Sequence, residues 1–388
     1  MGILRFLLAF AVFNAHAGLP IGFSIVSGAT AVHCFFVISG FYMAMVLSEK
    51  YSRSQATYFE FVSNRLLRLL PSYLLMLVLT FCLGIALSGL GKTVLPPLDS
   101  AQQLAGLGAG IIPLILHAFS QMTLLGQDLY HFFHWSPEAG FGFTPDFQND
   151  PASLHRLLFV PPAWSLSVEI YFYLLAPWLV RLRTSAIVGI IAASFIFRIV
   201  LAWQWGWQGD PWSYRFFPSE LAFFLAGVLA YRADFPSRAR VLPWMFALLA
   251  LGGALGLADT MESWQPGMPI HRWLRIPMFA LLAAGIPALF AATRNWRVDR
   301  QIGELSYPLY VSHFLVIWVA GLAFSDVTSG IARVMVVACA ILAAIALYKC
   351  IDTPIDRFRQ ARLKKRSPSA LKSLEGMPAS ELSAASGR

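Results

Sequence analysis

Residues 1–42 read MGILRFLLAFAVFNAHAGLPIGFSIVSGATAVHCFFVISGFY and contain two apolar stretches joined by a short link with glycine and proline. Each stretch is close to the length of about 20 residues that a helix needs to cross a bilayer. Arg5 and His16 lie in or beside the first stretch, and His33 and Ser39 lie in the second. Because an ionisable group inside a span is costly, we interpret such groups as parts of a site whose other members lie elsewhere in the chain.

The rest of the 388-residue chain has the same apolar character, with 57% hydrophobic and 13% charged residues. These are too few charges to cover the surface of a soluble domain. We therefore expect an all-α fold, a polytopic membrane bundle of about ten transmembrane helices whose first helix is retained rather than cleaved as a signal peptide. Hydropathy predicts the spans at about residues 3–20, 29–48, 66–89, 164–182, 185–204, 216–232, 242–259, 272–292, 303–324 and 330–350.

The distribution of Lys and Arg predicts the orientation of these spans. Basic residues follow the second, fourth, sixth, eighth and tenth spans, whereas the opposite loops are poor in Lys and Arg and contain several Asp and Glu. The positive-inside rule then puts both termini in the cytoplasm. The same rule accounts for the net charge of +9, and nucleic-acid binding has no support because no soluble face carries a basic stripe.

A long outer loop, about residues 90–163, separates the third and fourth spans. Within it, residues 104–125 are apolar enough to cross the membrane, but an eleventh span would turn Arg181 and Arg183 outward. We therefore predict a re-entrant or surface-lying helix there. The rest of the loop is rich in aromatic, Gly, Pro and acidic residues, which suits an ordered lid or acceptor-binding surface and equally an ordinary long loop.

The predicted domain organisation is simple. Residues 1–356 form one transmembrane domain, and residues 357–388 form a basic and then low-complexity cytoplasmic tail, which we expect to be disordered with its basic part near anionic lipid. The four cysteines fall in or at the end of apolar blocks without a paired spacing. The histidines are scattered over different spans, so no metal site is predicted.

Three ionisable residues stand out in the predicted spans. Alone, Arg5 is best explained as a topology anchor near the cytoplasmic end. His16 is either a helix-to-helix hydrogen-bonding group or a general base, because imidazole titrates near neutral pH. Glu169, about 7 Å inside the outer boundary, needs a cation, a proton or hydrogen-bond donors. Its depth is similar to that of His16, so we predict a pair in which the carboxylate orients the imidazole.

Other polar residues predict a substrate path. Arg65 and Arg68 share one helical face, which suits phosphate groups, although the positive-inside bias also explains two arginines. Ser39-Gly40 is either a packing notch or a place where Ser39 faces a polar interior. Trp164 is by itself an ordinary interfacial aromatic residue. His33 is interpreted mainly as a hydrogen-bonded residue near the outer end of its span.

The ninth predicted span carries a polar stripe, from Ser306 and Tyr307 to Tyr310 and His313. Tyr310 and His313 are three residues apart, so they lie on one helical face near mid-membrane. Such a stripe must face other helices or a cavity, because lipid offers no hydrogen-bond partners.

Taken together, these segments resemble the acyltransferase 3 family of integral membrane O-acyltransferases, from Arg5 to about Asp356. The resemblance rests on six motifs in order: the Arg5/His16 spacing, Phe35–Phe41, Arg65/Arg68 with Leu69-Leu70-Pro71, Trp164-Ser165-Leu166-Ser167-Val168-Glu169, Ser306–His313 and Asp352-Thr353-Pro354. The chain departs from the family pattern at Val32-His33-Cys34 and at Ile170-Tyr171, where many members carry acidic residues. The second departure leaves Glu169 as the one carboxylate of its motif.

The resemblance implies a bacterial inner-membrane enzyme that transfers an acyl group, most often acetyl from acetyl-CoA, to a hydroxyl of a glycan, lipid-linked saccharide or small molecule. It implies His16 and Glu169 as the catalytic pair and no bound cofactor besides acyl-CoA as donor substrate. The substrate-binding residues would be Arg5, Ser39, Arg65, Arg68, Trp164, Ser165, Tyr307, Tyr310 and His313. Two alternatives remain: a transporter or flippase of a lipid or glycan precursor, and a structural subunit of a polysaccharide-assembly complex.

Overall fold

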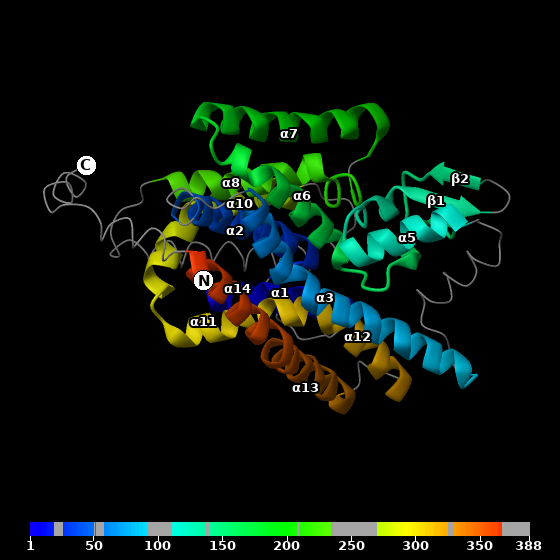
Figure 1. Cartoon of the computed structure of the whole chain (residues 1–388). Helices are drawn as coiled ribbons and strands as arrows, with labels where there is room; N and C mark the ends of the chain where they lie inside the picture. The colour runs from blue at the N-terminus through cyan, green and yellow to red at the C-terminus, as the bar shows by residue number, and fades with distance from the viewer. Residues whose placement is uncertain are drawn as a thin grey trace, which may run out of the picture.

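The computed structural model is a bundle of helices that carries a small β-hairpin at one end (Figure 1). The N-terminus, α11 and α14 lie at the opposite end of the bundle. The structure describes residues 1–18, 26–49, 51, 58–91, 111–136, 140–207, 209–233, 270–324 and 330–366.

Nine of the ten predicted spans coincide with helices in the described residues, and the predicted span at about 242–259 lies outside them. Five helical stretches are long and apolar enough to cross a membrane: Gly28–Glu49, Tyr58–Gly89, Thr184–Trp205, Arg297–Ala323 and Gly330–Arg362. A helical membrane protein is therefore supported, and the number ten stays a prediction. The nine helices are α1 Gly2–Ala17, α2 Gly28–Glu49, α3 Tyr58–Gly89, α6 Ala163–Leu179, α7 Thr184–Trp205, α8 Phe217–Arg232, α10 Ile270–Thr293, α12 Ser306–Ala323 and α13 Gly330–Leu347.

Helix ends differ from the predicted spans where polar residues continue a helix past its apolar part. α3 begins at Tyr58 instead of 66, and a separate helix α11, Arg297–Glu304, precedes α12. A π-helical turn, Tyr348–Asp352, joins α13 to α14, Thr353–Arg366. Residues 357–366, which we expected to be disordered, are thus helical, because Arg, Gln, Ala, Leu and Lys all favour helix. Residues 367–388 lie outside the described residues.

The loop between α3 and α6 contains short ordered elements. α5, Ile111–Thr123, has 13 residues, about 20 Å of helix, which is too short to cross a bilayer. Strands β1, Phe133–Ser136, and β2, Gly140–Phe143, form an antiparallel hairpin between two 3₁₀ turns, Leu129–His131 and Leu154–Leu157. The described residues are predominantly helical, as the all-α prediction expects, and this two-stranded hairpin is a small element that the prediction did not include.

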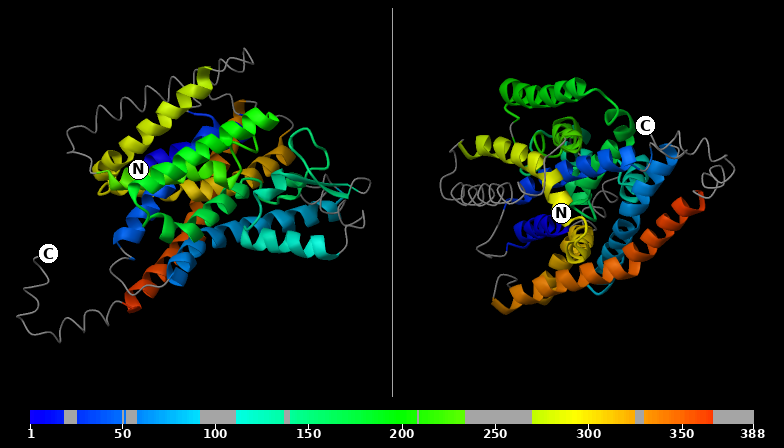
Figure 2. Two further views of the ribbon diagram at one scale, coloured as in Figure 1. Left: turned by 90° about the horizontal axis from the view of Figure 1, so that it is seen from above. Right: turned by 90° about the vertical axis from the view of Figure 1, so that its left-hand side faces the viewer.

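Close helix packing positions the site. α2 is the central helix, with 78% of its apolar window buried, whereas α7 and α13 lie on opposite sides of the bundle with 17% and 22% buried (Figures 1 and 2). Gly40 of α2 and Gly227 of α8 allow these helices to touch, since a Cβ at Gly40 would lie 1.9 Å from the carbonyl oxygen of Phe224. Asp299 of α11 accepts hydrogen bonds from the first backbone N–H groups of α1 and so fixes that helix.

Candidate active site

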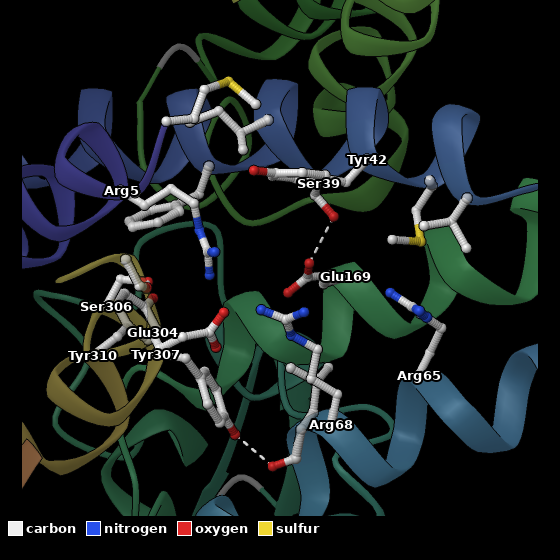
Figure 3. Close-up of a pocket in the computed structure, with 18 of the residues that line it drawn as sticks. Arg5, Ser39, Tyr42, Arg65, Arg68, Glu169, Glu304, Ser306, Tyr307 and Tyr310 are labelled. Atoms are coloured by element: carbon white, nitrogen blue, oxygen red, sulfur yellow. Dashed lines mark hydrogen bonds between the residues drawn. The ribbon is translucent and has the colours of Figure 1, made fainter. Parts of the chain in front are cut away.

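A cavity of about 470 Å³ opens between α1, α2, α3, α6 and α12 (Figure 3). We call it the arginine cavity. Six arginines line it, against four carboxylate side chains, and Figure 3 shows several of them converging on its centre. The arginines are Arg5, Arg65, Arg68, Arg294, Arg300 and Arg359, and the acids are Glu169, Asp299, Glu304 and Asp356.

The three arginines predicted from the sequence line this cavity. The side chains of Arg5 and Arg68 make no hydrogen bond or close ion pair with a described residue, although both feel the attraction of Glu304 and Glu169 across the cavity. The buried Nε of Arg65 has no hydrogen-bond partner among the described residues. Their guanidinium groups point into the space between the helices (Figure 3). Arg65 is buried and the other two are half-buried, and guanidinium groups in this state can take an anionic ligand.

Glu169 lies in the same cavity, on α6. Its Oε1 accepts a hydrogen bond of 2.7 Å from Ser39 of α2 and one of 2.5 Å from Tyr173, one turn further along α6. These hydroxyl donors hold the carboxylate in a defined position. Ser39 therefore faces a polar interior, as one interpretation of Ser39-Gly40 expected. The adjacent Gly40 packs against α8, as the packing-notch interpretation expected.

A second cavity of about 580 Å³ lies near the hairpin, and we call it the histidine cavity. It is lined by histidine and aromatic side chains and by two arginines, with no carboxylate among its described lining residues. The polar and aromatic residues that line it include His16, His131, His155, Arg156, Trp164, Tyr214, Arg215 and Tyr310.

Two imidazoles form a chain beside the histidine cavity. His313 Nδ1 lies 2.6 Å from the carbonyl oxygen of Tyr310, and His16 Nδ1 lies 2.9 Å from that of Val12. Because a carbonyl only accepts hydrogen bonds, both Nδ1 atoms carry the proton. The Nε2 of His313 then accepts from His16 Nδ1 at 3.3 Å. His16 Nε2 makes no hydrogen bond with a described residue, and its lone pair is free for a ligand in the cavity.

The predicted pairing of His16 with Glu169 is wrong. The two residues line different cavities, and each has its hydrogen bonds elsewhere. The prediction compared only depth in the membrane, whereas the direction in which a helix points a side chain decides its contacts. His16 faces α12, so its neighbour is His313, and Glu169 faces α2.

One wall separates the two cavities. Val32 of α2 and Tyr310 of α12 line both of them. The hydroxyls of Ser165 and Tyr310 lie 2.7 Å apart in a hydrogen bond, and the carbonyl oxygen of Pro162 is an acceptor for both, at 2.9 Å from Ser165 Oγ and 3.4 Å from the Tyr310 hydroxyl. The adjacent Trp164 lines the histidine cavity, so neighbouring residues of α6 face opposite sides of the wall.

The remaining predicted residue, Tyr307, lines the arginine cavity and donates its hydroxyl hydrogen to the carbonyl oxygen of Leu69. His33, in contrast, is held for structure. Its Nε2 lies 3.1 Å from Oε2 of Glu220 without hydrogen-bond alignment, and its ring stacks on Phe223. Among the described residues, no group of three or more His, Cys, Asp or Glu comes together in a way that could hold a metal ion.

Sequence reasoning missed the outer members of the histidine cavity. Arg215 donates to both oxygens of Asp210, at 2.6 and 2.8 Å, and its guanidinium lies 4.4 Å from the centre of the Trp164 ring. Arg156 comes from the second 3₁₀ turn. A signal was available, because Arg156 and Arg215 lie in predicted outer loops, where arginine is otherwise scarce.

Comparisons with known proteins agree with this geometry. Residues 1–349 match a family described as "Acyltransferase domain". The chain is 24% identical over 354 residues to the "Exopolysaccharide production protein ExoZ" of Rhizobium meliloti (strain 1021), covering 89% of this chain and 95% of that protein. It is 25% identical over 217 residues to an "Uncharacterized protein" of Aquifex aeolicus (strain VF5), covering 52% and 89% of the two chains. No solved structure matches. The chain belongs to the acyltransferase 3 family of membrane acyltransferases.

Proposed function

We propose that this acyltransferase is an inner-membrane O-acyltransferase, with both termini cytoplasmic, that moves an acyl group, most simply acetyl, from acyl-CoA to a hydroxyl of a glycan or lipid-linked saccharide. One observation carries the proposal. Arg5 and Arg68, which make no close ion pair, line one cavity, an imidazole with a free nitrogen lines another, and the cavities meet at Val32 and Tyr310. The relative named for exopolysaccharide production supports a glycan as the acceptor.

The arginine cavity is the donor side in this proposal. Arg65 and Arg68 hold the phosphates of CoA, because a guanidinium group makes forked hydrogen bonds to phosphate oxygens. Arg5, from α1, lines the same cavity and favours the thioester end. Glu169 belongs to this side too, where its hydrogen bonds with Ser39 and Tyr173 shape the path of the pantetheine arm. The arm leads the thioester towards the wall.

The histidine cavity is the acceptor side. His16 Nε2 takes the proton of the acceptor hydroxyl while the hydroxyl oxygen forms a bond to the thioester carbon. The resulting imidazolium is stabilised by the Val12 carbonyl oxygen and by His313, which here replaces the expected carboxylate. The tetrahedral intermediate then collapses, the C–S bond breaks, and the departing thiolate takes the proton from His16. The products are the ester and free CoA.

The hydroxyl groups in the wall stabilise the transition state. Tyr310 and Ser165 are already hydrogen-bonded to each other at 2.7 Å, at the place where the two cavities meet. Turned towards the thioester carbonyl, the Tyr310 hydroxyl donates to the negative oxygen of the tetrahedral intermediate. Such a donor is typically worth a factor of about 10² to 10³ in rate.

The test uses purified protein in lipid nanodiscs with acetyl-CoA. We expect free CoA thiol to appear only when a hydroxyl-bearing acceptor, such as a lipid-linked saccharide extract, is also present. Thiol release independent of acceptor would overturn acyl transfer to a hydroxyl. Movement of the same saccharides across vesicles without acetyl-CoA, and no thiol release with it, would instead support the transporter.

A further inference from the structure

The histidine cavity contains charge of one sign. Arg156 and Arg215 line it, and its described lining residues include no carboxylate and no side-chain amide. Those are the groups that usually accept hydrogen bonds from the hydroxyls of a neutral sugar. The cavity therefore differs from a site built for an uncharged saccharide.

The two arginines are held in different ways. Arg215 is fixed by the two bonds to Asp210 and by its position over Trp164, so one carboxylate offsets its charge. Arg156 is exposed, and its side chain makes no hydrogen bond or ion pair with a described residue. The guanidinium group of Arg156 is thus available to a ligand that enters beside the fixed Arg215.

Two histidines of the cavity report its positive potential. Burial, Arg156 and Arg215 lower the pKa of His155 to about 4. Burial, Arg215 and His155 lower the pKa of His131 well below its usual value. Both rings are neutral at pH 7, so the arginines supply the charge of the cavity. An anion in the cavity would offset this potential.

Aromatic side chains complete the site. Trp164 and Tyr214 lie edge to face with ring centres 4.7 Å apart, and both line the cavity. Aromatic faces are suited to the apolar faces of sugar rings, while guanidinium groups are suited to carboxylate and phosphate. Next to them lies His16, whose free Nε2 defines where the acceptor hydroxyl must be.

We infer that the acceptor is an acidic saccharide, a sugar with a carboxylate or phosphate group, and that Arg156 binds its anionic oxygens while Arg215 and Trp164 position the sugar next to His16. This inference rests on the proposed function, because it treats the histidine cavity as the acceptor side. The two sources of the anion are an acidic sugar residue and the phosphate of a glycosyl carrier, and both present the same oxygens to the guanidinium group.

The test measures binding without acyl transfer, so its result is independent of the donor. The His16→Gln variant in nanodiscs is dialysed to equilibrium with radiolabelled methyl glucoside, methyl glucuronide or glucose 1-phosphate. We expect at least one anionic probe to bind roughly ten-fold tighter than the neutral probe. Preference for the glucuronide identifies an acidic sugar residue, and preference for the phosphate identifies the carrier. Equal binding of all three probes would overturn the inference.

Variants of Arg156 sharpen the test. In the His16→Gln background, Arg156→Gln should abolish the preference for the anionic probe, and Arg156→Lys should restore part of it. The matched control is Arg181→Gln, the same change at an exposed arginine outside both cavities. A preference unchanged by Arg156→Gln would overturn the role of this residue. Loss of the preference in Arg181→Gln would also overturn the role of Arg156, because the preference for the anionic probe would then depend on the net charge of the protein.

Discussion

The arginine cavity and the buried cluster around Glu220 contain the same residue types in opposite states. In the cluster, Arg198 of α7 donates to Glu220 of α8 at 2.8 Å and to the carbonyl oxygen of Ser219, and His33 of α2 contacts the other carboxylate oxygen. In the arginine cavity, the side chains of Arg5 and Arg68 make no hydrogen bond or close ion pair with a described residue and face Glu304 and Glu169 only across the cavity.

The histidines repeat this contrast. His33 stacks on Phe223 and faces a buried carboxylate, whereas His16 keeps Nε2 free toward a cavity. His33 is buried, whereas His16 is exposed at the histidine cavity. Residue type alone would not separate the two sets. Burial against a partner does, because an ionisable group within a span that lacks one needs a reason other than the fold. We therefore expect a structural role for one set and a chemical role for the other.

The largest expected effect separates the two histidines. His16→Gln should lower kcat by about 10² to 10⁴-fold, because glutamine cannot accept a proton, and should leave the melting temperature unchanged. His33→Gln should do the reverse, retaining acyl transfer and lowering the melting temperature. The measurements are thiol release and thermal unfolding in detergent. A His16→Gln variant that retained its kcat would remove the general base from the mechanism.

The next prediction concerns the structural arginine. Arg198→Gln leaves the fully buried Glu220 without its cation, and breaking a buried pair from one side costs roughly 3–5 kcal/mol. We expect a clear fall in melting temperature. Glu49→Gln, at the exposed end of α2, is the control, and its effect should stay within about 0.5 kcal/mol. Equal melting temperatures for the two variants would mean that the cluster does not hold α2, α7 and α8 together.

The functional arginines should show the opposite result. Arg68→Gln removes a guanidinium group that makes no close ion pair and is attracted only across the cavity by Glu304, Asp356 and Glu169, so the melting temperature should fall less than in Arg198→Gln. The KM for acyl-CoA should rise about ten- to a hundred-fold, because a hydrogen bond to a charged group is worth about 1.5–3 kcal/mol. Steady-state kinetics with acetyl-CoA as the varied substrate test this. An unchanged KM would return Arg68 to a topology role.

The residues of the site were more predictable from the sequence than their contacts. Charge in an apolar stretch is visible in the sequence, and it identified Arg5, His16, Arg65 and Arg68. The three arginines line the arginine cavity, and His16 lines the histidine cavity. Which residues meet depends on the rotation of each helix, and α6 and α12, with apolar residues on nearly every face, give little periodic signal for it. This explains why His313 rather than Glu169 is the neighbour of His16.

The fold, too, was only partly predictable from the sequence. Helices were predicted from apolar length, whereas the β-hairpin was missed because its eight paired residues show little alternation of polar and apolar types. The histidine cavity depends on that loop, since His131, His155 and Arg156 all come from it. The loop between α3 and α6 was interpreted either as a lid or acceptor-binding surface or as an ordinary long loop. The histidine cavity favours the binding surface.

The smallest expected effect tests the wall between the cavities. Val32 lines both cavities, whereas Val46, on the same helix, lines only the arginine cavity. Val32→Ala removes two methyl groups where the acyl chain must fit. We expect kcat/KM for butyryl-CoA relative to acetyl-CoA to rise about three- to ten-fold, since each buried methylene is worth about 0.8 kcal/mol. Val46→Ala removes the same atoms away from the wall and should leave the ratio unchanged. An equal change in both variants would mean that the overall size of the arginine cavity, and not the wall, limits the acyl chain.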